Sequence, residues 1–176
     1  MFAYERPVRF EDVDAAHIVF FPRVLAYCHE AMAELMAELA GGYARLVVER
    51  RIGLPTVHVE VDFTAPLRFG DVAKIELDVA RIGRSSTTFA MRVSRVHDSA
   101  AVANVKLVCA ASDLSTLRSV TLPEDVRRVL EAHLVTPSRA RGQPGHAVSS
   151  SLSPRSGGRV RKTSAGSTPR ARNRRT

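Results

Sequence analysis

The sequence predicts an α+β fold in which an antiparallel sheet wraps around one long helix. A single long stretch with helical periodicity follows a short first strand, four strand-like segments then come in succession, and tight turns join them. An antiparallel sheet with one apolar face needs a cover, which a long amphipathic helix can supply. The edge that such a sheet leaves free can be covered by pairing across a two-fold axis.

The helical elements and the first strand follow from local patterns. Tyr4–Glu11 partly alternates and is expected to be a short strand, at an edge because it contains Pro7. Pro22 suits the first turn of the long helix, and Gly41-Gly42 is expected to end it. A shorter helix is expected over Ala44–Arg51. Apolar residues recur at helical spacing along the long helix: Val24, Leu25, Cys28, Met32, Leu35, Met36 and Leu39.

Later segments alternate in the manner of strands. The strand candidates are Thr56–Phe63, Val72–Ile82, Thr87–Val96 and Ala100–Leu114. Turn residues separate them: Gly70-Asp71, Gly83-Arg84-Ser85 and His97-Asp98-Ser99. In the first candidate, Val57, Val59, Val61 and Phe63 point one way while His58, Glu60 and Asp62 point the other. A terminal helix is expected over Pro123–Leu134.

The net positive charge of the chain comes from its last forty residues. The net charge is +8, yet ten of the 26 basic residues and none of the 18 acidic ones lie in 137–176. That stretch is predicted to be a disordered basic tail because it has almost nothing to bury, and residues 1–136 are predicted to form one domain. The domain has a slight excess of acidic residues, which gives no reason to expect a specific nucleic-acid partner.

Other composition features indicate a cytoplasmic protein. Cys28 and Cys109 lie far apart and form neither a disulfide framework nor a zinc motif. The N-terminus has no signal-peptide pattern, and no apolar run is long enough to cross a membrane. Neither a phosphate-binding glycine loop nor a metal-spaced His/Cys cluster is visible, so no cofactor is expected.

One segment, Phe10–Pro22, combines groups suited to catalysis. Asp12 and Asp14 lie in the connection just before the long helix, whose N-terminus presents unpaired N–H groups and a partial positive charge. Such groups can stabilise an oxyanion while a nearby carboxylate attacks a carbonyl or activates water. Aspartates ahead of helices also serve as caps. A haloacid-dehalogenase interpretation is disfavoured, because the strand before the motif is not continuously apolar.

The stretch Phe10–Met32, FEDVDAAHIVFFPRVLAYCHEAM, resembles the signature of the 4-hydroxybenzoyl-CoA thioesterase family of hot-dog proteins. The resemblance implies an acyl-CoA thioesterase with Asp14 as catalytic carboxylate and the Phe21 backbone N–H as oxyanion donor. Asp14 would be the nucleophile or the general base. The Cys28–Ala31 run is most similar to the branch that includes 1,4-dihydroxy-2-naphthoyl-CoA hydrolases. An aromatic acyl group is therefore expected, with a short aliphatic one as the alternative.

The resemblance continues downstream and implies further contacts. Leu54–Asp71 is similar to the family's second strand and its Gly-Asp turn, and Arg84, Ser85 and Ser86 resemble the turn near CoA. The family builds its site between subunits, which implies a homo-oligomer, either a dimer or a dimer of dimers (a homotetramer). His17 stands where the family usually has glycine, and some relatives have histidine at the position of Phe21.

Several candidates stay open. His58 could contact the acyl group or be an ordinary surface histidine, and His17 lies in the loop expected to meet the substrate. Glu30 is a second candidate carboxylate, because some hot-dog enzymes carry theirs on the helix, whereas Cys28 is expected to pack in the core. A hot-dog protein that binds acyl thioesters without cleaving them is the other alternative. The presence of Asp14 favours the enzyme.

Overall fold

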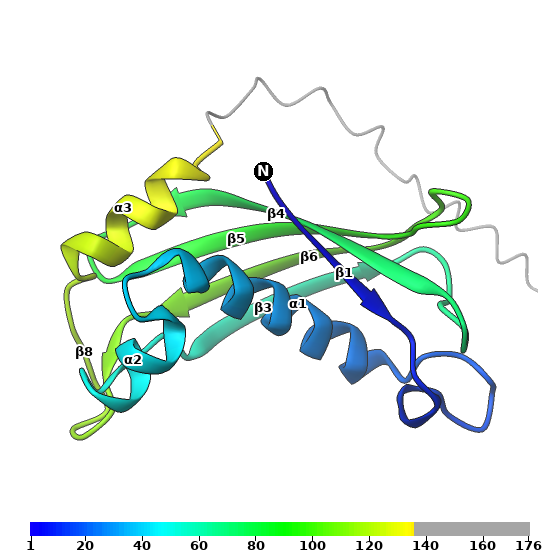
Figure 1. Ribbon diagram of the computed structural model, residues 1–176, viewed down its shortest axis with the longest axis horizontal. Helices are drawn as coiled ribbons and strands as arrows, with labels where there is room; N and C mark the ends of the chain where they lie inside the picture. Colours follow the sequence, from blue (N-terminus) through cyan, green and yellow to red (C-terminus); the bar gives the residue numbers. More distant parts are fainter. Residues whose placement is uncertain (136–176) are drawn as a thin grey trace, which may run out of the picture. The chain divides into compact units, whose positions relative to one another are not determined.

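The structure is a computed structural model that describes residues 1–135, so the predicted tail at 137–176 and its boundary at Thr136 lie outside the described part. Its main sheet has the strand order β1-β4-β5-β6-β3, and every neighbouring pair is antiparallel. The strands are β1 (Phe2–Pro7), β3 (Thr56–Phe63), β4 (Val72–Ile82), β5 (Ser86–Arg95) and β6 (Ala101–Ala110). Figure 1 shows this sheet curving around one long helix, as predicted.

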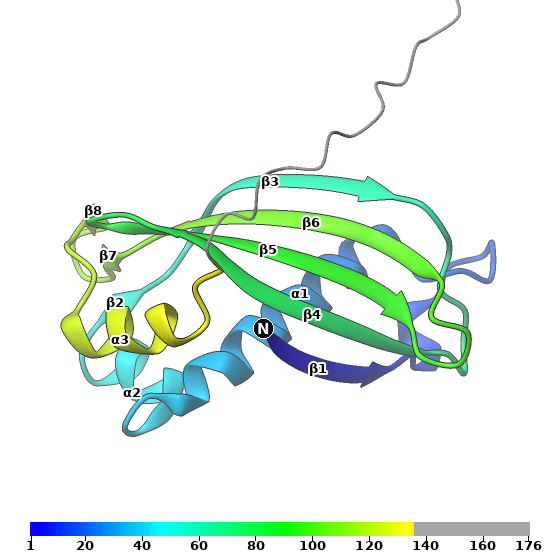
Figure 2. The same ribbon diagram turned by 90° about the horizontal axis from the view of Figure 1, so that it is seen from above.

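The long helix α1 (Phe21–Leu35) lies against the inner face of the sheet (Figures 1 and 2). Its core-facing residues include Cys28, Met32 and Leu35, which are fully buried. Strands β4 and β5 alternate between buried and partly exposed positions, and their inward residues Ile75 and Phe89 are fully buried. The apolar stripe of the helix and the apolar face of the sheet therefore form one core.

The connection after α1 is tighter than predicted. The helix stops at Leu35 and becomes a 3₁₀ turn, η2 (Met36–Glu38), before Gly41 precedes α2 (Gly42–Val48). Gly41 has φ +85°, and a Cβ there would collide with the Arg45 side chain. Gly41 therefore allows the chain to reverse and begins the next helix, whereas the sequence indicated only an end to the previous one.

A small second sheet at one end of the molecule was not predicted. It joins β2 (Ile52–Gly53), β7 (Ser112–Asp113) and β8 (Arg118–Ser119). Two-residue strands carry no detectable period, which explains why the expected strand Ala100–Leu114 is instead divided at Ala111. The terminal helix α3 (Glu124–Ala132) agrees with the prediction and buries Val126 and Leu130. No helix within residues 1–135 is long and apolar enough to cross a membrane.

Strand β3 forms an edge of the main sheet and pairs only with β6 among the described strands. Its inward residues Val59 and Phe63 are 42% and 48% exposed, although their cross-strand neighbours on β6 are buried. Val57, which the sequence predicts to point the same way, lies where the register of the two strands shifts, so it has no partner on β6, and it is 62% exposed. The alternation of β3 thus matches that of an inner strand, yet within one chain its apolar face is left uncovered.

Candidate active site

The connection between β1 and α1 is a compact, hydrogen-bonded loop. Strand β1 ends at Pro7, earlier than predicted, and the 3₁₀ turn η1 (Phe10–Asp12) follows. Val13 and Val19 then form an antiparallel bridge that closes the intervening residues into a hairpin. The Val19 N–H donates to Leu67 O at 2.8 Å, which fixes the hairpin to the chain before β4.

Asp14 lies in this hairpin directly after the bridge and is exposed. Its Oδ1 accepts the Ala16 N–H at 2.8 Å, and its own N–H donates to Ile18 O at 3.0 Å. No hydrogen bond among residues 1–135 uses Oδ2 of Asp14. The carboxylate is therefore oriented through one oxygen while the other is free to meet a substrate or a water molecule.

His17 adopts a backbone conformation that L-residues rarely take. Its φ is +58°, and its N–H donates to Asp14 O at 2.9 Å. A side chain in the left-handed region costs about 1–2 kcal/mol. This conformation gives a physical reason for the family's glycine at this position. The exposed imidazole of His17 lies on the loop that carries Asp14.

The N-terminus of α1 presents one clear backbone donor. Pro22 has no N–H, and the Arg23 N–H already donates to Phe20 O at 2.8 Å. Among residues 1–135 no hydrogen bond uses the Phe21 N–H, and Phe21 is 58% exposed. The helix dipole adds positive potential at this point. The Phe21 N–H is thus available to an incoming carbonyl oxygen.

Asp12, unlike the exposed Asp14, is buried, with only 1% of its surface exposed. Its Oδ2 accepts the Arg9 N–H at 2.8 Å and lies 3.5 Å from Arg6 Nη1, and its Oδ1 lies 3.7 Å from Arg23 Nε. The buried Tyr27 hydroxyl faces the same carboxylate. Neither Asp12 Oδ1 nor that hydroxyl has a hydrogen-bond partner among residues 1–135.

These partners keep Asp12 ionised despite its burial. Burial alone would raise the pKa of Asp12, but the Arg9 N–H, the Tyr27 hydroxyl and the charges of Arg6 and Arg23 outweigh it and hold the pKa below its ordinary value. Burial and the adjacent Asp12 carboxylate in turn raise the pKa of Tyr27. The carboxylate is therefore negative, and Tyr27 is neutral, at any physiological pH.

An apolar pocket of about 390 Å³ opens beside the N-terminus of α1. Most of its lining residues are aliphatic or aromatic: Ile18, Val19, Phe21, Val24, Phe63, Ala65, Pro66, Leu67 and Val102. Thr64 also lines it, and its hydroxyl donates to Ala101 O at 2.8 Å. The pocket therefore suits a flat or branched apolar group whose carbonyl approaches Phe21.

The predicted CoA-contacting residues lie at the other end of the sheet. Arg84 and Ser85 form the turn between β4 and β5, and Ser86 begins β5. Backbone bonds fix this turn, including Gly83 N–H to Ser86 O at 2.7 Å and Leu122 N–H to Arg84 O at 2.9 Å. β4 has 11 residues, so at about 3.3 Å per residue its two ends lie roughly 33 Å apart. The structure does not bring Arg84 and Asp14 together within one chain.

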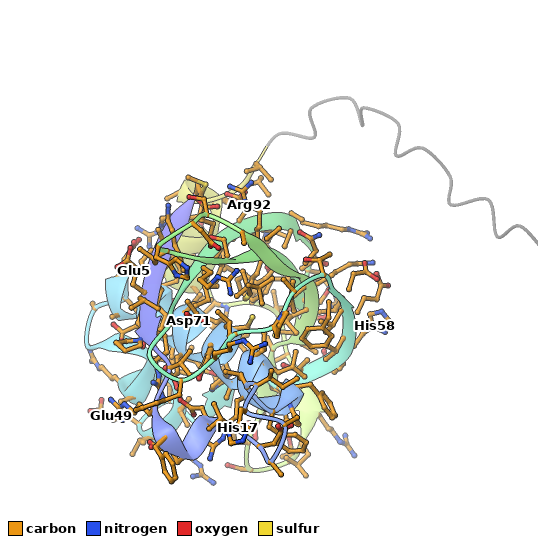
Figure 3. All side chains as sticks on the ribbon, turned by 90° about the vertical axis from the view of Figure 1, so that its right-hand side faces the viewer. Glu5, His17, Glu49, His58, Asp71 and Arg92 are labelled. Carbon is orange, nitrogen blue, oxygen red and sulfur yellow. The ribbon has the colours of Figure 1, made fainter. Side chains whose placement is uncertain are left out.

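The remaining sequence candidates have other neighbours. His58 lies on the outer face of β3, and its Nε2 is hydrogen-bonded to Glu60 Oε1 at 2.8 Å. Figure 3 shows His58 well apart from His17. Glu30 accepts hydrogen bonds from the Tyr4 hydroxyl and from Arg6 Nε, each at 3.0 Å. Cys28 is fully buried, and burial raises the pKa of its thiol to about 12. Cys28 therefore packs in the core as predicted.

Sequence reasoning missed the polar cluster around Asp12. The motif was interpreted through its second aspartate, while Arg6 and Tyr27 were not singled out. Two signals were present, since Arg6 interrupts a partly alternating strand and Tyr27 adjoins the apolar stripe of the helix. Within residues 1–135 no three His, Cys, Asp or Glu side chains are grouped so as to hold a metal ion.

Comparisons with known proteins agree with this architecture. The family model of the thioesterase-like superfamily matches residues 8–130. The chain is 33% identical over 131 residues to the 1,4-dihydroxy-2-naphthoyl-CoA hydrolase of Synechococcus elongatus, which covers 74% of this chain and 95% of the relative. These matches confirm the resemblance seen in the sequence.

Solved structures are similar over the same part of the chain. A gentisyl-coenzyme A thioesterase is 25% identical with a TM-score of 0.65, covering 73% of this chain and 98% of its own. A 1,4-dihydroxy-2-naphthoyl-CoA thioesterase from Synechocystis is 24% identical with a TM-score of 0.67, covering 73% and 94%. The hot-dog fold predicted from the sequence is thereby confirmed.

Proposed function

Because this chain belongs to the thioesterase-like superfamily, we propose that it hydrolyses the CoA thioester of an aromatic acid. One observation carries the proposal: the Asp14 carboxylate lies in a hydrogen-bonded hairpin beside an apolar pocket, close in sequence to the Phe21 N–H, which no other group among residues 1–135 engages. The known relatives named above act on dihydroxynaphthoyl-CoA and gentisyl-CoA, which are thioesters of hydroxylated aromatic acids.

The groups of this loop suit the reaction. The acyl oxygen would accept a hydrogen bond from Phe21 N–H, which stabilises the negative charge that develops when the carbonyl carbon is attacked. Asp14 either attacks that carbon itself or removes a proton from the water molecule that does. The carbon–sulfur bond then breaks, and CoA leaves as the thiolate, which takes up a proton. If water attacked, the free acid is released at this step. If Asp14 attacked, the acyl group is left on Asp14 as an anhydride, which a water molecule then hydrolyses to the free acid and the Asp14 carboxylate. Nothing in this sequence of steps requires a cofactor.

The pocket beside α1 supports an aromatic acyl group. Its lining is apolar and includes Phe21 from α1 and Phe63 from β3. Such a lining suits an aromatic ring better than a charged or strongly polar group. A short aliphatic acyl group would fill less of the pocket and gain less from burial. The aromatic group is therefore the favoured substrate, and the aliphatic one stays the alternative.

A dimer would complete the site. The uncovered apolar residues of β3 and its free backbone edge favour pairing with β3 of a second copy, antiparallel across a two-fold axis. Such pairing reverses the partner end to end and would bring its Arg84 turn toward the loop end of this chain. Arg84, Ser85 and Ser86 could then contact the CoA portion of a thioester held between subunits. A dimer of dimers and a cytoplasmic location stay predictions.

A panel of acyl-CoAs tests the proposal. Benzoyl-, hydroxybenzoyl-, dihydroxynaphthoyl- and short aliphatic acyl-CoAs would each be assayed for release of free thiol. We expect the highest kcat/KM on an aromatic thioester. Tight binding of these thioesters without thiol release would instead favour the non-catalytic binding protein. A higher kcat/KM on short aliphatic chains would contradict the aromatic assignment alone.

A further inference from the structure

The proposed reaction leaves a buried charge unexplained. Asp12 lies two residues before Asp14, is 1% exposed, and cannot reach a substrate through solvent. An ionised carboxylate at such a position is costly unless several partners compensate it. The positions of those partners in the fold show which elements the Asp12 carboxylate connects.

The partners of Asp12 come from three elements: the strand β1, the loop that contains η1 and the helix α1. Arg6 belongs to β1, the Arg9 N–H precedes η1, and Arg23 and Tyr27 belong to the first two turns of α1. The Arg6 guanidinium also lies over the Tyr27 ring, 4.9 Å from its centroid. The carboxylate is therefore the common contact of the strand, the loop and the helix.

The backbone of Asp12 extends this connection to both reacting groups. Its carbonyl oxygen accepts the Phe20 N–H at 2.9 Å, and Phe20 directly precedes Phe21. On the other side, Val13 forms the bridge to Val19 that closes the hairpin beginning at Asp14. Asp12 thus contacts the chain immediately before the proposed oxyanion donor and stands immediately before the strand pair that orients the proposed carboxylate.

We infer that Asp12 is a positioning residue: its buried carboxylate fixes the Asp14 hairpin relative to the Phe21 N–H. The inference rests on the proposed function, because it assigns Asp12 an effect on the groups named there. Catalysis depends steeply on such placement, and a misplacement of about 1 Å can cost about a hundredfold in rate. A residue that acts only on stability would have no such effect on kcat in the folded protein.

A second ion-paired carboxylate provides a matched control. Glu76 on β4 has a mostly buried side chain that is paired with Lys74 and Arg92, and none of these contacts involves the hairpin or the first turn of α1. Glu76→Gln should lower the melting temperature and leave kcat within the error of the assay. It separates the loss of a paired charge from the loss of the connection to the loop.

The test is a double-mutant cycle between Asp12→Asn and Asp14→Asn on the full chain. In the otherwise unchanged protein, Asp12→Asn should lower kcat by about tenfold to a hundredfold with little change in KM. In the Asp14→Asn background it should lower kcat no further, because the group that it positions is gone. The melting temperature should fall equally in both backgrounds, so that a purely structural effect is recognised.

Three outcomes decide between the readings. An equal fold-loss of kcat in both backgrounds, or an unchanged kcat for folded Asp12→Asn, overturns the positioning role. Near-normal turnover of Asp14→Asn contradicts the proposed function itself, whatever Asp12 does. If circular dichroism shows that Asp12→Asn does not fold, the same cycle is run with Tyr27→Phe. That variant keeps the ring over Arg6 and removes only the hydroxyl beside Asp12. It should lower kcat severalfold in a chain that keeps Asp14 and should have no effect on kcat in the Asp14→Asn chain.

Discussion

The two ends of the main sheet differ in how they are built. At the loop end, a buried carboxylate joins three elements and the hairpin contains a left-handed histidine at position 17. At the turn end, Arg84 and its neighbours form an ordinary hydrogen-bonded turn with no positive φ among residues 83–86. The loop end thus has the features of a preorganised reaction site, whereas the turn end only presents a cation and hydroxyls. One protomer holds both halves of the predicted site but at opposite ends.

The largest expected effect lies at the loop end. Asp14→Asn should keep the fold and lower kcat by about a thousandfold or more, because it removes the carboxylate that we propose as nucleophile or general base. Glu49→Gln changes an exposed carboxylate that follows α2 and pairs with Arg45, so it is the matched control and should leave kcat unchanged. Thiol release under saturating acyl-CoA measures both. A folded Asp14→Asn enzyme with near-normal turnover would exclude the mechanism.

A mixture of two variants tests whether the loop end of one chain and the turn end of another form one site. Arg84→Ala should raise KM by about tenfold, the worth of one charged contact to a phosphate. Denatured Arg84→Ala and Asp14→Asn chains, refolded together, should recover activity at low substrate concentration. In a mixed dimer one site then takes Asp14 from one chain and Arg84 from the other.

Each variant refolded alone is the control for the mixing experiment. Activity of the mixture that equals only the sum of the two separate variants would show that a site draws both residues from the same chain. The substrate would then have to reach from Asp14 to Arg84 of the same chain, along the length of β4.

Disruption of the β3 edge should prevent two chains from pairing, so that the loop end of one chain no longer meets the turn end of another. Val59→Lys places a charge in the middle of the uncovered apolar face of β3, and its burial in an interface would cost several kcal/mol. We expect a folded monomer by light scattering at micromolar concentration, with most of the activity lost. Phe69→Lys replaces another exposed apolar residue outside β3 and should leave the oligomeric state unchanged. An active Val59→Lys monomer would remove the need for a second chain.

The sequence predicted much of this comparison and missed its physical cause. The bounds of β3 and β4 agree with the predicted segments, because strict alternation and flanking turn residues define them locally. The position of Asp14 ahead of α1 was also predictable. The burial of Asp12 was not, since it depends on Arg6 and Tyr27, which reach the loop only in the folded chain. The exposure of the apolar residues of β3 was not predictable either, since it depends on which strands α1 covers in the folded chain.

The pH dependence of stability should differ between the wild type and Asp12→Asn. The pKa of Asp12 in the folded chain is below its ordinary value of 3.8. Its ionisation therefore stabilises the fold above that value, and the contribution is lost as the pH falls through the lower, folded pKa. At neutral pH the variant should be less stable by about 3 kcal/mol, and the difference should shrink below about pH 4. A difference independent of pH, measured by urea unfolding, would contradict an ionised Asp12.

The smallest effect tests the strain in the loop. His17→Gly removes a left-handed strain of about 1–2 kcal/mol but adds about 0.5–1 kcal/mol of unfolded-chain entropy. The net gain in stability should therefore be about 0.5 kcal/mol, a rise of roughly 1–2 °C in Tm. His17→Ala keeps the positive φ while it removes the imidazole, so it should show no such rise. If the imidazole contacts substrate, both variants should raise KM equally. If only the backbone matters, KM should stay unchanged in His17→Ala, and the loop at this end of the sheet tolerates histidine without using it.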